Sequence, residues 1–90
     1  MAERISIIGF TEAEGTQDWR VLGDGATAFF RTGSFEASGA LVGAIAPLAD
    51  DHGRPPEVDI RAMGVTVRIL TLTAEYMGLT TDDLELARAI

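Results

Sequence analysis

The chain has 90 residues, of which 47% are hydrophobic and 23% charged, the size and composition of one small globular domain. Fourteen acidic residues against seven arginines give a net charge of −7, which disfavours binding to nucleic acid or to an anionic membrane. The absence of lysine and cysteine excludes Schiff-base chemistry, thiolate catalysis and cysteine-based metal sites. With no apolar run long enough to span a bilayer and no secretory signal, we expect one cytoplasmic domain over residues 1–90.

The first third of the chain predicts a short helix and a β-hairpin. Ser6 can cap a helix over Ile7 to Ala13. Segments 19–22 and 26–32 are rich in strand-forming residues and flank the turn Gly23-Asp24-Gly25. These segments therefore predict two paired antiparallel strands.

A second helix is predicted to follow Ser34, which can act as its N-cap. Pro47 marks its final turn in this prediction, because a proline deeper inside a helix costs about 3 kcal/mol. Segment 50–56 lacks an apolar period and predicts a loop. Apolar residues recur every three or four positions along the helix, forming one stripe: Ala37, Leu41, Ala44, Ile45 and Leu48.

Two further strands are predicted on either side of Met63-Gly64. Apolar and charged residues alternate over 57–62, as in a strand with one buried face. The alternation resumes at Val65, but Leu70 and Leu72 fall on the opposite face. This pattern predicts a bulge or a second covered face in that strand.

The last helix has the strongest local start signal in the chain. Thr80 is a candidate N-cap, Asp83 stands at the third helical position, and Leu79 can pack on Leu84. The resulting order α-β-β-α-β-β-α predicts an α+β fold, a four-stranded antiparallel sheet with helices packed on one face. The other face is expected to be partly apolar, which favours self-association as a homodimer or homotetramer.

The loop around His52 is the first candidate for chemistry. His52 could bind a metal with Asp50, Asp51, Glu57 or Asp59, although a solvated acidic loop explains the same residues, and no metal is expected. Ser34 or Ser38 could pair with His52 as a nucleophile, but both also suit helix capping or a helix surface.

General acid–base chemistry is the alternative for the same loop. His52 titrates near neutral pH, and Asp50 or Glu57 could orient it or carry a second proton. Arg54 could hold an anionic or carbonyl group of a substrate, or pair with Asp51. An exposed loop histidine without any role is the competing interpretation.

The sequence resembles the pterin-4a-carbinolamine dehydratase family from about Trp19 to Ile90. The segment Glu75-Tyr-Met-Gly-Leu-Thr-Thr-Asp-Asp-Leu-Glu-Leu-Ala-Arg-Ala-Ile90 is similar, without gaps, to the family's C-terminal pattern. Phe29 resembles the family's aromatic second strand, and Ser34-Phe35 and Ala37 resemble the opening of its main helix. The resemblance implies an oligomeric, cofactor-independent α+β protein that dehydrates a 4a-hydroxytetrahydropterin through histidines.

The histidine signatures are where this chain departs from the family. The family pattern is an acidic residue, three residues, then His-His-Pro-Glu or His-His-Pro-Asp, with a later Thr-His-Asp or Thr-His-Glu. Here Asp50, Pro56 and Glu57 match the first signature, but Arg54 and Pro55 replace its histidines. The second signature reads Thr73-Ala74-Glu75, so its histidine is replaced by Ala74.

Three functions follow from this comparison of motifs. The first is a diverged pocket that binds a small molecule or catalyses a different proton-transfer, dehydration or cyclisation step. His52, Asp50 and Glu57 would be its catalytic groups, and the substrate-binding residues would be Arg54, Pro56, Ala74 and Glu75. The second is a non-catalytic protein-interaction or assembly module. The third is retained pterin dehydration with His52 in place of a family histidine.

Overall fold

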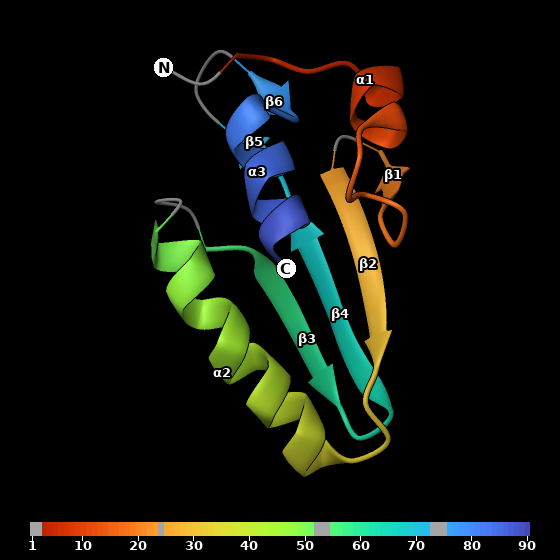
Figure 1. Cartoon of the computed structure of the whole chain (residues 1–90), viewed down its shortest axis with the longest axis vertical. Coiled ribbons are helices and arrows are strands. Elements are labelled where there is room, and N and C mark those ends of the chain that lie inside the picture. The colour runs from red at the N-terminus through yellow and green to blue at the C-terminus, as the bar shows by residue number, and fades with distance from the viewer. Residues whose placement is uncertain (1–2, 24, 52–54, 73–75) are drawn as a thin grey trace.

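A computed structural model describes residues 3–23, 25–51, 55–72 and 76–90 of the chain. Strands β1, β2, β4 and β3 form, in that order, an antiparallel sheet, and β5 pairs with β6 in a separate two-stranded sheet (Figure 1). The predicted α+β fold with a four-stranded antiparallel sheet is confirmed. The elements are α1 (Ile7–Glu12), β1 (Arg20–Leu22), β2 (Gly25–Arg31), α2 (Phe35–Asp51), β3 (Glu57–Arg61), β4 (Gly64–Ile69), β5 (Thr71–Leu72), β6 (Met77–Gly78) and α3 (Thr81–Ala89).

One face of the four-stranded sheet forms the hydrophobic core with the helices. Ala28 on β2 is aligned with Val67 on β4, and Val67 with Val58 on β3, so these side chains share that face. Each helix contributes to the same cluster, through Phe10 of α1, Ile45 of α2, and Leu86 and Ala87 of α3. The helices thus pack on one face of the sheet, as predicted.

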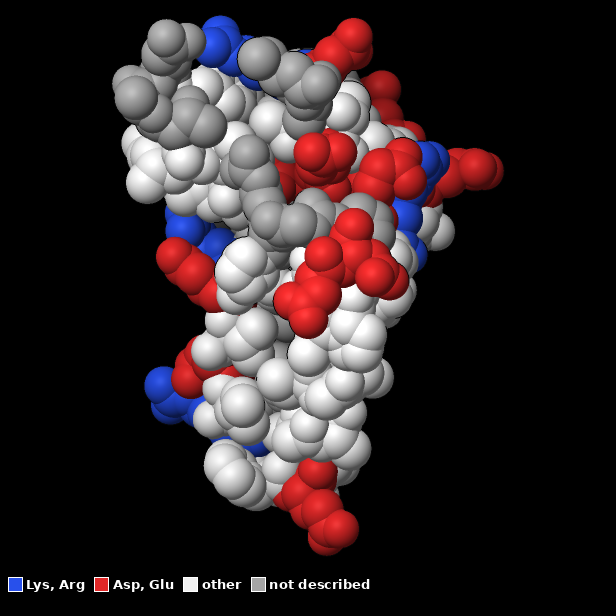
Figure 2. Space-filling view, turned by 90° about the vertical axis from the view of Figure 1, so that its left-hand side faces the viewer, with Lys and Arg blue, Asp and Glu red and all other residues white. Residues whose placement is uncertain are grey.

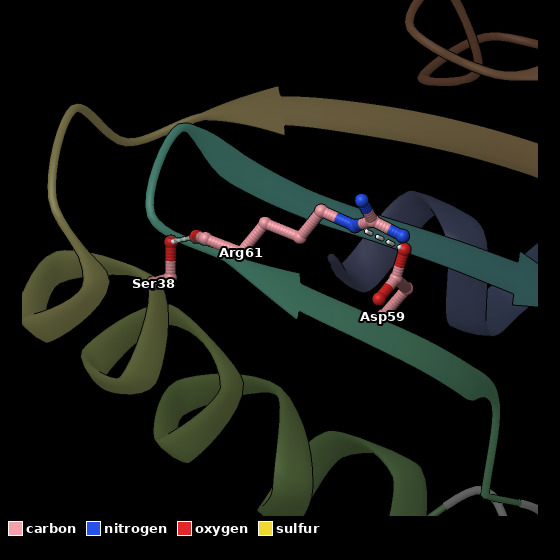
Figure 3. A network of polar contacts seen from close by, with 3 residues as sticks. All are labelled: Ser38, Asp59 and Arg61. Carbon is pink, nitrogen blue, oxygen red and sulfur yellow. Dashed lines mark hydrogen bonds and ion pairs between the residues drawn. The ribbon is translucent and has the colours of Figure 1, made fainter.

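A buried serine fastens α2 to the far end of β3. The Ser38 side chain is fully buried, and its hydroxyl donates to the Arg61 carbonyl oxygen at 2.6 Å (Figure 3). Thr32, in the segment before α2, shares a hydrogen bond with the same hydroxyl. Arg61 itself points away from Ser38 and pairs with Asp59 at 3.0 Å. The link fixes α2 along the edge strand.

The C-terminal end of α2 differs from the prediction. The helix runs to Asp51, so Pro47 lies inside it rather than in its final turn, and Asp50 is helical rather than part of a loop. Ile45 and Ala49 are buried on either side of Pro47. Their burial supports the helix across the proline, which removes only one backbone hydrogen bond. In the predicted apolar stripe of α2, Ala44 is in fact exposed.

The end of β4 also differs from the prediction. Val67, Ile69 and Thr71 are all buried, so the alternation continues in phase, while Leu72 is 66% exposed. The expected change of buried face is wrong for Leu72. The strand is nevertheless interrupted at Leu70, which is half-buried and separates β4 from β5. Thr71 holds the inward position because its hydroxyl donates to Asp83 Oδ2 at 2.6 Å. The buried position is taken by a polar residue, Thr71, so a pattern based on apolar residues did not predict its burial.

The predicted start of α3 is confirmed. The Thr80 side chain accepts from the Asp83 backbone N–H, and the Asp83 carboxylate accepts from the Thr80 backbone N–H at 2.8 Å, which completes a capping box. Asp83 is only 2% exposed. It also accepts the Thr71 hydroxyl, so one buried carboxylate joins β5 to the first turn of α3.

The second face of the sheet, here called the outer face, is polar. The register aligns Arg20 with Thr27, Thr27 with Arg68, and Arg68 with Glu57, so these four side chains cross the sheet in one row. Among the side chains described on this face, Phe29 is the exception, and the expectation of a partly apolar outer face holds only there. The remaining outer-face residues are Arg31, Asp59, Arg61, Gly64 and Thr66.

Candidate functional site

A small apolar pocket lies between the C-terminal half of α2 and the start of β3. Its volume is about 190 Å³. The residues of the first family signature that border it are Asp50, Pro55 and Pro56, which come from the end of α2 and the segment before β3. Its other walls are Val42, Ile45, Ala46, Ala49 and Val58. The structure thus brings two predicted site residues, Asp50 and Pro56, to one cavity.

The α2 walls of this pocket were not predicted as site residues. The sequence pattern places Ile45 in the apolar stripe of the helix but predicts no role for Val42, Ala46 and Ala49, which also line the pocket. Their four-residue spacing from Val42 to Ala46, and from Ile45 to Ala49, places them in adjacent turns on the side of α2 that meets β3. This spacing could have indicated a common helix face, but placing the end of the helix near Pro47 left Ala49 close to the helix end.

Glu57 lies on the other side of the sheet from the pocket. Its partner across the strands is Arg68, and the two side chains form an ion pair at 3.4 Å on the outer face. Val58, the next residue, faces the pocket instead. Because successive side chains of a strand alternate between faces, Asp50 and Glu57 do not act on one ligand in this arrangement.

Four predicted site residues, His52, Arg54, Ala74 and Glu75, lie outside the described residues. The described segments end next to them, at Asp51 in α2 and at Leu72 in β5. Within the described ranges, no three acidic or histidine side chains are grouped closely enough to hold a metal ion. Asp59, one of the candidate ligands, is paired with Arg61.

The two serines considered as nucleophiles have structural contacts. Ser34 Oγ accepts from the Ala37 backbone N–H at 3.0 Å, which is the N-cap interaction predicted for it. The Ser38 hydroxyl is buried between Thr32 and the Arg61 carbonyl group. Both contacts favour the capping and packing interpretation of these residues.

The pocket can bind an uncharged, compact group and present one carboxylate to it. Its volume lies below the roughly 300–1,000 Å³ typical of sites that enclose a whole drug-sized ligand, so it suits one ring or a short chain. The exposed Asp50 carboxylate at its rim can accept a hydrogen bond or a proton. Pro55 and Pro56 offer no titratable group.

Comparison with known proteins identifies the family. The family model for pterin 4 alpha carbinolamine dehydratase matches residues 9–90. The chain belongs to the pterin-4a-carbinolamine dehydratase family. The matched range includes all residues that line the pocket and the whole of α3. The capping box and the segment from Asp50 to Glu57 are therefore parts of the family domain.

Two relatives of this dehydratase family illustrate the range of similarity. A protein of Nocardia farcinica (strain IFM 10152), whose name assigns it provisionally to pterin-4-alpha-carbinolamine dehydratase, is 38% identical over 80 residues, covering 89% of this chain and 82% of the relative. The crystal structure of a transcriptional coactivator/pterin dehydratase from Brucella melitensis superimposes with a TM-score of 0.81 at 21% identity, covering 97% and 94% of the two chains. The second likeness supports the fold alone. No helix in the described part of this dehydratase-family chain is long and apolar enough to cross a membrane.

Proposed function

We propose that this chain binds a small molecule in the pocket between α2 and β3 and does not use the three-histidine chemistry of its family. The main support for the proposal is that Pro55 occupies the position of a family histidine and lines the pocket. Proline has no side-chain group that could transfer a proton. The neighbouring pocket walls are apolar, so ligand binding would depend on burial of apolar surface.

Asp50 is the carboxylate among the described residues that line the proposed pocket. An apolar ligand with a hydrogen-bond donor or a cationic group would place that group near Asp50 and its apolar part against Ala49 and Val58. If the site also catalyses a reaction, the proton carriers in this proposal are Asp50 and His52. Glu57 is left out, because it is engaged with Arg68 on the outer face.

The test combines a fragment screen with an activity assay. Two-dimensional NMR of the whole chain, titrated with small amines and amides that carry one ring, should shift the signals of Ala49, Asp50 and Val58. Asp50→Asn removes the negative charge but keeps an acceptor oxygen, so it should weaken the binding of the amines more than that of the amides. Asp51→Asn, which changes an exposed carboxylate outside the pocket, should leave both unchanged. Equal effects of the two variants on the amines, or shifts that never reach these residues, would refute the proposal.

The activity assay measures the breakdown of 4a-hydroxytetrahydropterin above its spontaneous rate. We expect no acceleration by the wild-type chain. Acceleration that His52→Ala removes would instead establish retained family dehydration with His52 as the proton carrier, and the proposed loss of that chemistry would be wrong.

A protein-interaction function is the second candidate, favoured by the surface of α2. Between Glu36 and Asp50 the helix carries no charged residue, and Gly39, Ala40, Gly43 and Ala44 are exposed. Figure 2 shows the corresponding uncharged, white stretch below the cluster of acidic residues. The free edge strand β3 lies beside this helix, so a second copy of the chain could contact both.

Ala44→Glu tests this second candidate, because it places a charge in the middle of the uncharged surface. If copies associate there, the variant should be smaller than the wild type in analytical ultracentrifugation. Glu85→Gln on the exposed side of α3 is the control and should leave the mass unchanged. A monomeric wild type would remove self-association from this proposal.

A further inference from the structure

The outer face of the sheet has a hollow that is separate from the pocket between α2 and β3. The hollow has a volume of about 330 Å³, and the residues that line it are Gln17, Asp18, Arg20, Thr27 and Phe29. Arg20 and Thr27 are neighbours across β1 and β2. Three kinds of group therefore meet in the hollow: an aromatic ring, a guanidinium and a carboxylate with an adjacent amide.

Phe29 gives the hollow an exposed aromatic surface. Its side chain is 56% exposed, whereas Ala28 before it is buried and Phe30 after it is half-buried. The ring lies over Gly64 of β4, where a Cβ atom would come within 3.0 Å of two ring carbons. Contact with the Gly64 backbone fixes one part of the ring, and the exposed part remains accessible for stacking.

Arg20 offers a guanidinium with no ion-pair partner among the described residues. The other arginine of its row, Arg68, is paired with Glu57, and Arg61 is paired with Asp59. An arginine without a carboxylate partner can bind a carboxylate group of a ligand through two parallel hydrogen bonds. Arg20 is the arginine that lines the hollow.

The distribution of charge also favours an anionic ligand on this face. The outer face and the rim of the hollow contain four of the chain's seven arginines and three of its fourteen carboxylates among the described residues. Over the rest of the chain carboxylates outnumber arginines, so an approaching anion is repelled less on this face than elsewhere.

We propose that this hollow is a second binding site, which takes a small aromatic carboxylate that also carries an amino group. The ring would stack on Phe29, the carboxylate would bind Arg20, and the amino group would donate to Asp18 or to the Gln17 amide oxygen. A volume of about 330 Å³ falls within the range of small-molecule sites. This site is independent of the function proposed for the pocket beside α2.

The test uses 4-aminobenzoate as the probe in an NMR titration of the whole chain. Signals of Asp18, Arg20, Thr27 and Phe29 should shift, while those of Ala49 and Val58 should not. Cyclohexanecarboxylate, which keeps the anion but lacks both the aromatic ring and the amino group, should bind about tenfold more weakly, and so should aniline, which keeps the ring and the amino group but lacks the anion.

Matched variants separate a built site from general attraction of anions. Arg20→Gln should raise the Kd for 4-aminobenzoate about tenfold. Arg31→Gln is the control, because Arg31 is an exposed outer-face arginine that does not line the hollow and has no ion-pair partner among the described residues. Equal weakening by the two variants, shifts confined to the α2 pocket, or no shifts at all would overturn the proposal.

Phe29→Leu keeps the residue apolar but removes the aromatic ring. The Kd should rise several-fold for 4-aminobenzoate and remain unchanged for cyclohexanecarboxylate. An equal change for both probes would show that Phe29 does not act by stacking. A circular dichroism melting curve of each variant, unchanged from that of the wild type, confirms that the comparison is made on folded protein.

Discussion

The start of α3 and the end of α2 both adjoin segments that carry the family's histidine signatures, but they are held in different ways. At α3, buried Asp83 accepts hydrogen bonds from Thr80 and Thr71, so polar contacts fix the first turn. At α2, the last turn contains no basic residue and ends with two exposed aspartates, and packing of Ala49 against the core holds it. The described contacts at the start of α3 are directional hydrogen bonds, whereas those at the end of α2 are apolar packing contacts.

The largest effect is expected from removing the polar anchor of α3. Asp83→Ala deletes the acceptor of the Thr71 hydroxyl and of the Thr80 backbone N–H. The Thr71 hydroxyl keeps Thr80 Oγ1 at 3.2 Å, but the buried Thr80 N–H loses its acceptor, so the free energy of unfolding should fall by about 2–3 kcal/mol. Urea denaturation measures the change. Asp82→Ala, an exposed neighbour in the same turn, should cost less than about 1 kcal/mol. Equal losses would mean that the network does not anchor the helix.

The next largest loss of stability is expected from the Ser38 hydrogen bonds near the N-terminal end of α2. Ser38→Ala leaves the Arg61 carbonyl oxygen without its donor and should cost about 1–2 kcal/mol in chemical denaturation. Thr32→Val removes the other partner of the Ser38 hydroxyl. If the three groups act together, the double variant should lose less than the two single losses combined. Strict additivity would contradict a shared network.

A stabilising change is expected inside α2. Pro47→Ala restores a backbone N–H that can donate to the Gly43 carbonyl oxygen, and it should raise the free energy of unfolding by about 2 kcal/mol after allowance for the more flexible unfolded chain. Thermal unfolding followed by circular dichroism measures this. The same gain should appear in the Asp83→Ala background if the two helix ends are independent. A loss of stability would indicate that the proline ring has a packing role.

The smallest expected effect is also the most direct test of the two helix ends. Asp51→Arg places a positive charge at the C-terminus of α2 and should stabilise the protein by about 0.5 kcal/mol, because it complements the helix dipole. Asp82→Arg makes the same substitution in the first turn of α3 and should destabilise it by a similar amount. Both effects should shrink at high salt. Effects of equal sign would show that net charge, rather than the dipole, controls them.

The sequence predicted best those features that depend on neighbouring residues. Thr80 and Asp83 are three positions apart, and the capping box they form needs only local geometry. Ser6 likewise caps α1, which begins at Ile7 as predicted. The strand alternation predicted over 57–62 also follows from nearest neighbours, and β3 covers Glu57–Arg61 of it. Its expected buried face is less buried than predicted, because Val58 is half-buried and Ile60 is exposed.

Features that depend on distant contacts were predicted less well. The end of α2 was placed too early, because local propensity at Pro47 could not include the burial of Ala49 in the core. Strand β6 was not predicted either, although its partner β5 ends only four residues before it, because two residues are too few to show a strand pattern. The pocket that joins Asp50 to Val58 depends on the packing of α2 against β3, which no local pattern contains.

The burial of Trp19 provides the protein with a built-in optical reporter. It is the only tryptophan in the chain, is 5% exposed, and makes an edge contact with Phe30 at 6.3 Å between ring centroids. Intrinsic fluorescence excited at tryptophan therefore comes from one position in the core, and its emission should move to longer wavelength when water enters. The fluorescence of Trp19 can therefore report folding in stopped-flow experiments without an added label. It reports on the region next to β1, which is distant in sequence from α3.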